Sequence, residues 1–151
     1  MITLMDIIKA INKQLKATFP EITIQSTDVK EGYKRPCFYV DVIDFDGEIF
    51  MDAYDHKTAA FTIYYFPSDP NNYRVELLEI REKLNDTFIG VLDVAQGFKI
   101  HILDTAANVS DGVLGFDFEI EYYQRRKEKD NHGTTGGNEY SLIENVEFDN
   151  L

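Results

Sequence analysis

Apolar and polar side chains alternate strictly along residues 113–123, directly after the turn dipeptide Asp111-Gly112. Successive side chains of a β-strand point to opposite faces of the sheet, so this period of two predicts a half-buried strand. One predicted face is apolar and consists of Leu114, Phe116, Phe118, Ile120 and Tyr122. The other face carries Asp117, Glu119 and Glu121, an acidic ladder whose carboxylates are spaced by about 6.6 Å. They repel one another unless water, cations or basic side chains lie beside them.

Two other segments have helical periodicity. Residues 3–18 place apolar side chains at helical spacing, and Thr3 and Asp6 occupy the positions of an N-terminal capping box. The apolar stripe consists of Leu4, Ile7, Ile8, Ile11 and Leu15. A second stripe, made of Leu77, Ile80, Leu84 and Phe88, predicts another helix after the turn-forming residues 67–72.

The other regular segments are predicted to be strands. They are residues 22–27, 37–45, 48–54, 59–66 and 98–103. Asp46-Gly47 is a hairpin signal, so the chain is expected to turn there. Residues 98–103 are expected to pair with strand 113–123. Strands grouped between two helices predict an α+β fold, with an antiparallel or mixed sheet, both helices on one face, and the order α-β-β-(β)-β-α-β-β.

The chain of 151 residues has the length of one ordinary domain, which we expect to span residues 1–127. Residues 128–138 are a polar linker without periodicity. Residues 139–151 form an acidic C-terminal tail that also contains several apolar side chains. Such a segment either docks on a neighbouring surface or is a frayed terminus, and the sequence favours neither interpretation.

Charge and cysteine content exclude some functions. With 15 Lys plus Arg against 27 Asp plus Glu, the formal net charge is -12, which argues against a protein that grips nucleic-acid phosphates. The lone Cys37 rules out an internal disulfide and a cysteine-based metal site. No apolar run approaches the roughly 20 residues of a membrane span. We therefore expect a soluble protein that is cytosolic when made.

No arrangement of residues typical of catalysis is found. His56, His101 and His132 are scattered without metal-ligand spacing, and Cys37 is expected to be a buried, inert thiol. We predict no enzymatic activity, no cofactor and no metal. A metal-dependent nuclease built on the acidic ladder is a remote alternative, because paired carboxylates bind divalent cations. The simplest interpretation of such a charge run is a solvated face.

Three stretches, together with the N-terminal Ile-x-x-Ile-Asn-x-x-Leu pattern, resemble a known family. They are residues 31–40, 61–67 and 111–118, which read EGYKRPCFYV, FTIYYFP and DGVLGFDF. In order and spacing these stretches are similar to the phage tail terminator family of phages and phage-derived elements of Gram-positive bacteria. The resemblance covers roughly residues 2–125.

The resemblance implies a non-enzymatic structural role. Terminators of long tails close as a ring, commonly a hexamer, on the last ring of tail tube protein, stop polymerisation and present the surface that joins the head. The implied partners are further copies of the chain, the tube protein, and possibly the tail sheath and the head-to-tail connector, while DNA passes through without specific binding. The implied location is the host cytoplasm during assembly and then the head-proximal end of the virion tail. The nearest alternative is a head-to-tail neck adaptor, a tail completion protein.

Two groups of residues are candidates for subunit contacts in such a ring. Tyr33, Lys34 and Arg35 bring positive charge into an acidic protein, and we expect them to meet carboxylates of an adjacent subunit or of the tube. Ordinary surface charge is nearly as good an interpretation. The acidic ladder of Asp117, Glu119 and Glu121 is expected either to line the lumen, where it would repel DNA phosphate, or to pair with basic side chains across the subunit boundary.

Overall fold

The computed structural model describes residues 1–25 and 34–126. Its elements, in chain order, are α1 (Leu4–Thr18), β1 (Thr23–Gln25), β2 (Cys37–Phe50), β3 (Tyr54–Phe66), α2 (Arg74–Phe88), β4 (Gly90–Ala95), β5 (Phe98–Ile102), β6 (Thr105–Ser110) and β7 (Val113–Arg125). The predicted α+β class and both predicted helices are confirmed. Tyr33, the linker at residues 128–138 and the tail at residues 139–151 lie outside the described residues.

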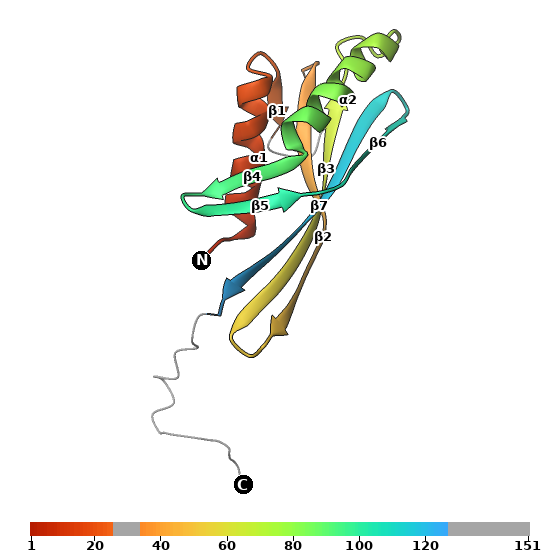
Figure 1. Cartoon of the computed structure of the whole chain (residues 1–151). Helices are drawn as coiled ribbons and strands as arrows, with labels where there is room; N and C mark the ends of the chain where they lie inside the picture. Colours follow the sequence, from red (N-terminus) through yellow and green to blue (C-terminus); the bar gives the residue numbers. More distant parts are fainter. Residues whose placement is uncertain (26–33, 127–151) are drawn as a thin grey trace.

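The main sheet has five strands in the order β1-β2-β3-β7-β6. The short β1 runs parallel to the start of β2, while β2, β3, β7 and β6 pair antiparallel in turn, so the sheet is mixed as expected. A separate two-stranded sheet contains β4 and β5. Both helices and this small sheet cover one face of the main sheet (Figure 1).

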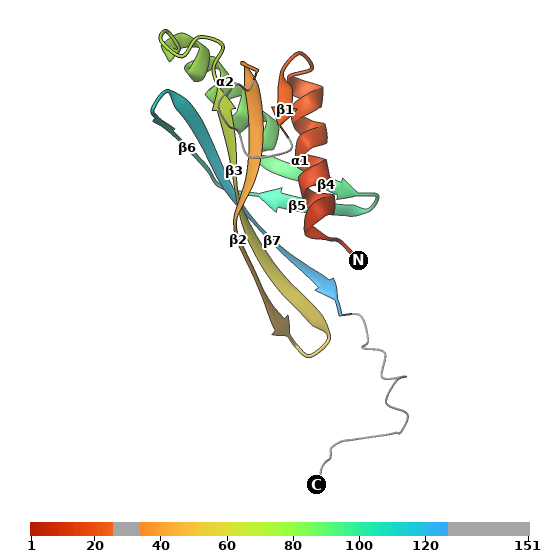
Figure 2. The same ribbon diagram turned by 180° about the vertical axis from the view of Figure 1, so that it is seen from behind.

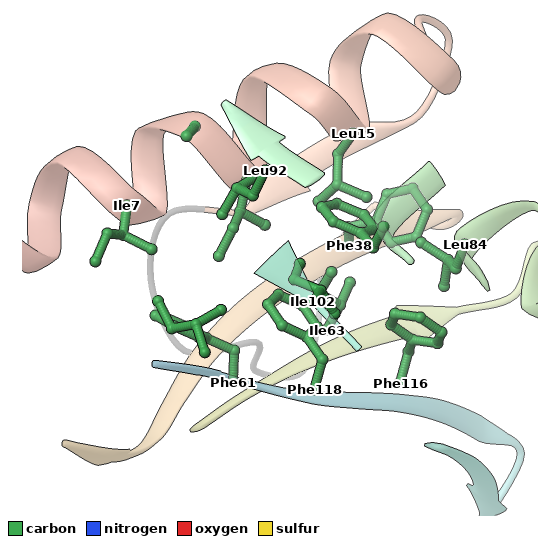
Figure 3. Close-up of a cluster of buried hydrophobic side chains, with 14 of the residues drawn as sticks. Ile7, Leu15, Phe38, Phe61, Ile63, Leu84, Leu92, Ile102, Phe116 and Phe118 are labelled. Atoms are coloured by element: carbon green, nitrogen blue, oxygen red, sulfur yellow. The ribbon is translucent and has the colours of Figure 1, made fainter. Parts of the chain in front are cut away.

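The core lies between the helices and the inner face of the sheet. Helix α1 buries Ile7, Ile11 and Leu15, and helix α2 buries the whole predicted stripe from Leu77 to Phe88. Their partners on the sheet include Phe38, Phe61, Ile63, Phe116 and Phe118, with Leu92 and Ile102 of the small sheet between the layers (Figure 3). The alternation in β7 is confirmed, since all five of its predicted core side chains are buried.

Helix α1 begins with the predicted capping box. The Thr3 side chain accepts a hydrogen bond from the Asp6 backbone N–H at 3.1 Å, and the Asp6 carboxylate accepts one from the Thr3 backbone N–H at 2.9 Å. These bonds satisfy two backbone donors that helix geometry would otherwise leave unpaired. They also hold the pKa of Asp6 below its usual value.

The prediction of a turn at Asp46-Gly47 is wrong. Strand β2 continues through both residues to Phe50, and the chain turns at residues 51–53. The predicted strands 37–45 and 48–54 are therefore largely one strand, which pairs with β3 along its whole length, with an irregularity between Val42 and Asp44. The backbone ladder with β3 outweighs the local preference of Asp-Gly for a turn.

The predicted pairing of residues 98–103 with the last strand is also wrong. Strand β5 pairs with β4, an element that the sequence did not indicate, and β6 is the partner of β7. The predicted turn at Asp111-Gly112 is confirmed between β6 and β7, where both residues have positive φ angles of 51° and 76°.

The β2–β3 hairpin extends beyond the layers that cover the main sheet (Figure 1). Figures 1 and 2 show its turn end extending away from the helices and the small sheet, accompanied by the end of β7. Every residue from Ile43 to Phe50 is exposed. A ribbon of three strands therefore projects from the core. No described residue covers its outer face or the end of β2, while Ile120, Tyr122 and Gln124 of β7 remain buried on the inner face.

Candidate interaction surfaces

The outer face of the sheet, opposite the helices, collects carboxylates from two strands. The strand register places β3 between β2 and β7, and the outward side chains of β3 are mostly small or hydroxyl-bearing. The flanking carboxylates are Asp41, Asp44, Asp46 and Glu48 on β2, and Asp117, Glu119 and Glu121 on β7. The predicted acidic ladder is thus one side of a wider surface, which we call the acidic face.

His56 of β3 joins the two sides of this face. Its Nδ1 atom lies 2.9 Å from Glu48 Oε1 on β2, and its Nε2 atom lies 2.7 Å from Glu121 Oε2 on β7. The imidazole also stacks on the Tyr123 ring, with 4.5 Å between ring centroids. Hydrogen bonds to Glu48 and then to Glu121 raise the pKa of His56, since both favour the protonated ring.

The three residues of the acidic ladder have different surroundings. Asp117 is half-buried and accepts a hydrogen bond of 2.5 Å from the Thr62 hydroxyl on β3. Glu121 is held by His56, as above. Glu119 is exposed and has no hydrogen-bond partner within the described residues. The carboxylate with most freedom to meet another molecule is therefore that of Glu119.

The projecting hairpin also exposes large apolar side chains. Ile49, Phe50 and Met51 lie at or beside its turn, and the Met51 side chain is 76% exposed. The Phe50 ring makes an edge contact with Tyr123 on β7, at 5.1 Å between centroids. Apolar side chains gathered on an extension without a covering layer are typical of a surface that contacts another protein.

The basic loop before β2 is only partly free to contact other molecules. Lys34 is exposed. The Arg35 guanidinium donates a hydrogen bond of 3.1 Å from Nη1 to the Pro67 carbonyl and lies 5.9 Å from the centroid of the Phe66 ring. Arg35 thus contributes to local structure at the end of β3, while the Lys34 ammonium remains in solvent.

No arrangement typical of metal or thiol chemistry is found in the described parts of the chain. Within residues 1–25 and 34–126, no three or more His, Cys, Asp and Glu side chains are grouped so as to hold a metal ion. Cys37 is buried, and this burial raises the pKa of its thiol, which favours the unreactive protonated form. Neither α1 nor α2, the two helices of the described residues, is long and apolar enough to cross a membrane.

Comparison with protein families identifies the chain. Residues 6–132 match the model of a family described as phage tail terminator protein. The chain belongs to the phage tail terminator family. No curated protein matches it significantly. This tail terminator is therefore a structural protein of the phage tail, located in the virion tail, and it interacts with other tail components.

The sequence indicated only part of the acidic face of this tail terminator. Asp44, Asp46 and Glu48 were missed, because the Asp-Gly dipeptide was interpreted as a turn. The alternation of acidic side chains at positions 44, 46 and 48 with Phe45, Gly47 and Ile49 was a signal against that interpretation. His56 could not be assigned from sequence, since its two partners come from other strands.

Proposed function

We propose that this tail terminator closes as a ring on the end of the tail tube, stops tube polymerisation and presents the surface to which the head is joined. Membership of the family supports a role in the tail. The observation that carries the ring is the projecting ribbon of β2, β3 and β7, because it offers uncovered strand edges and apolar side chains away from the core. The expected stoichiometry is six copies.

Two edges of this ribbon are unpaired within the described residues. Strand β1 pairs only with residues 37–39 of β2, and β6 pairs only with residues 113–118 of β7. The remaining parts of β2 and β7 present backbone N–H and C=O groups that a neighbouring chain can satisfy. Contacts between two different patches of identical subunits generate a closed ring when the rotation between subunits permits.

The acidic face supports the passage of DNA through such a ring. Seven carboxylates on one face, offset chiefly by His56 and Arg125, produce a negative potential that repels phosphate. We propose that Asp117, Glu119 and Glu121 line the lumen or pair with basic side chains across the subunit boundary. A negative lumen would keep DNA from binding to the wall.

The basic loop is proposed to contact the adjacent subunit or the tube. Lys34 is exposed and is the strongest candidate of the three predicted residues, whereas Arg35 is already bonded to Pro67. Tyr33 completes the proposed contact as a residue outside the described part of the chain. Residues 139–151 are proposed to dock on a neighbour.

The direct test is the mass of the chain in solution, measured alone and with purified tube protein. We expect a ring of one defined stoichiometry, formed either spontaneously or on tube ends, and tubes that stop growing when the chain is added. A chain that stays monomeric with tube ends and leaves tube length unchanged would exclude this function. Binding to the head-proximal connector without binding to tube ends would indicate a neck adaptor instead.

The role of the acidic face is tested by reversing charge on it. Glu119→Lys with Glu121→Lys should impair ring formation, tail length control or infectivity. Glu79→Lys with Glu82→Lys, on the exposed side of α2, makes the same change in net charge and is the matched control. Normal rings, tails and infectivity in the first variant would show that the acidic face has no such role.

A further inference from the structure

We propose that the tip of the β2–β3 hairpin, residues 49–54, inserts into a pocket between α2 and β6 of the next copy of the chain. This contact rests on the proposed ring and specifies how neighbouring subunits are joined. The tip and the pocket lie at opposite ends of the long strands (Figures 1 and 2). One chain therefore cannot fill its own pocket without a large rearrangement.

The pocket is apolar with a basic margin. It has a volume of about 500 Å³ and is lined mainly by Tyr73, Leu77, Leu78 and Val109, together with Arg74 and Arg81. Leu78 is 53% exposed, although it lies on a helix whose opposite side is core. No Asp or Glu of the described residues lines the pocket. Its chemistry suits a few apolar side chains carried on an acidic segment.

The hairpin tip has this chemistry. Ile49, Phe50 and Met51 are all exposed apolar side chains. Asp52 is the one charged side chain of residues 49–54, and the adjoining part of β2 adds Asp44, Asp46 and Glu48. Arg125 and Arg126 of β7 lie beside the other strand of the hairpin, so the β2 side of the tip is the acidic one, and the pocket margin carries Arg74 and Arg81. This charge complementarity favours a second copy of the same chain as the occupant, and it would fix the orientation of the tip during association.

The backbone of the turn provides an independent observation. Met51 and Asp52, in the three-residue turn 51–53, have φ angles of 51° and 57°, a left-handed conformation that favours Gly and Asn. A methionine at this position is unfavourable for the turn, and its side chain is exposed and does not pack in the core of its own chain. An exposed methionine with an unfavourable positive φ angle indicates that function, rather than stability, retains it there. A contact of Met51 with a neighbouring subunit would be such a function.

The symmetry of this contact agrees with a ring. Tip and pocket are different surfaces, so each copy offers one of each and the contact runs head to tail. Such contacts propagate around a closed ring and leave no subunit with an unused tip. A two-fold dimer, by contrast, would need a surface that is complementary to itself.

The experiment uses two full-length variants that each lose one surface. Ile49→Thr with Met51→Asn alters the tip, with residues that suit a strand and a left-handed turn, respectively. Leu78→Glu alters the pocket with a residue that favours helix. Leu103→Thr removes an apolar side chain that is 79% exposed elsewhere, and it is the matched control. Thermal unfolding establishes that every variant is folded, and native mass spectrometry, with and without tube protein, reports assembly.

Each surface variant alone should form no ring and should self-associate at least about 30-fold more weakly than the wild type, as expected for the loss of a hot spot. An equimolar mixture of the two should form a 1:1 pair and nothing larger, because only one intact tip and one intact pocket can meet. Leu103→Thr should form rings as the wild type does.

The alternative outcomes separate this contact from the ring itself. Rings that persist in the tip variant, even if tube binding is lost, would overturn the contact and leave the ring standing. Failure of two folded variants to form the 1:1 pair would also overturn it. A wild-type chain that stays monomeric with tube protein would overturn both.

Discussion

His56 and Glu121 lie on neighbouring strands, with 2.7 Å between His56 Nε2 and Glu121 Oε2, although 65 positions separate them in the sequence. The register that pairs Thr58 with Glu121 brings them together diagonally across the outer face. Because Glu48 holds the other ring nitrogen, one imidazole links β2, β3 and β7 where the ribbon leaves the core. Both ring nitrogens can donate to these carboxylates at once only when the imidazole is protonated.

The stability of the protein should depend on pH through His56. The pKa of His56 is raised in the folded state, so the protonated ring stabilises the fold. This contribution to the free energy of unfolding is fully present at pH values below the ordinary pKa of about 6.5, and it is lost as pH rises through the raised pKa. The side chains of Glu48 and Glu121 are 72% and 60% exposed, so solvent and salt screen the effect. Urea unfolding between pH 5 and pH 9 at low salt should show this loss.

Two variants test whether His56 causes this pH dependence of stability. His56→Gln should remove the loss of stability in this pH range, whereas His101→Gln, on an exposed site of β5, should retain it. In an NMR titration, Glu121→Gln should lower the pKa of His56 towards its ordinary value. An unchanged titration of His56 in that variant would mean that the contact does not form in solution.

The parts of the fold that sequence predicts best are those in which neighbours along the chain decide the outcome. The capping box of Thr3 and Asp6 and the alternation of β7 needed no distant partner. The turn at Asp46-Gly47 was mispredicted because β3, rather than the dipeptide, determines the conformation there. The small β4–β5 sheet was missed for the same reason, since its buried side chains depend on α1 and the main sheet for cover.

The candidate surfaces also combine features that the local sequence determines with features that depend on distant strands. Asp117, Glu119 and Glu121 are visible as a ladder because they share one strand, while the link through His56 depends on strand register. The projection of the hairpin tip could not be predicted either. Ile49 and Met51 look like core residues in the sequence, and only the layout of the layers shows that no described element covers them.

The turn of the long hairpin can be stabilised by substitution. Met51→Asn with Asp52→Gly should raise the free energy of unfolding by about 1 kcal/mol, because these residues adopt positive φ at lower cost. Ala53→Gly, at a neighbouring position without positive φ, should instead lower it by a few tenths of a kcal/mol. Denaturant unfolding measures both changes. Equal effects of the two substitutions would contradict the left-handed geometry of residues 51 and 52.

Gly112 is predicted to be more sensitive than a glycine of similar backbone geometry. A Cβ atom on Gly112, where φ is 76°, would lie 3.0 Å from Cε2 of Tyr73, whereas one on Gly97, where φ is 79°, meets nothing within 4 Å. Gly97→Ala should cost about 1 kcal/mol for the left-handed backbone alone. Gly112→Ala should cost about 1 kcal/mol more, from the contact with the Tyr73 ring. Equal losses in denaturant unfolding would show that the ring moves aside freely.

The link between the end of β3 and the start of α2 depends on one carboxylate. Glu76 accepts hydrogen bonds from the Tyr65 hydroxyl at 2.5 Å and from the Ser68 backbone N–H and hydroxyl at 2.9 Å and 2.6 Å. Burial acts to raise the pKa of Glu76, but the bonds from Ser68 and Tyr65 together hold it below its usual value. Burial, and then the bond to Glu76, raises the pKa of Tyr65, which therefore remains a donor at neutral pH.

Removal of the Tyr65 hydroxyl should therefore weaken both stability and its response to acid. Tyr65→Phe should lower the free energy of unfolding by about 1.5 kcal/mol at pH 7, the lower end of the range for a hydrogen bond to a charged group. Because the pKa of Glu76 is lowered in the folded state, the ionised carboxylate stabilises the fold. This contribution to the free energy of unfolding is present at pH values above the ordinary pKa near 4.5, and it disappears as pH falls through the lowered pKa. The loss of stability between pH 5 and pH 3 should be smaller in Tyr65→Phe than in the wild type. Tyr64→Phe, on the outward side of the same strand, is the control, and it should change neither the free energy of unfolding at pH 7 nor its loss between pH 5 and pH 3. Similar losses in the two variants would exclude a specific role for the Tyr65–Glu76 bond.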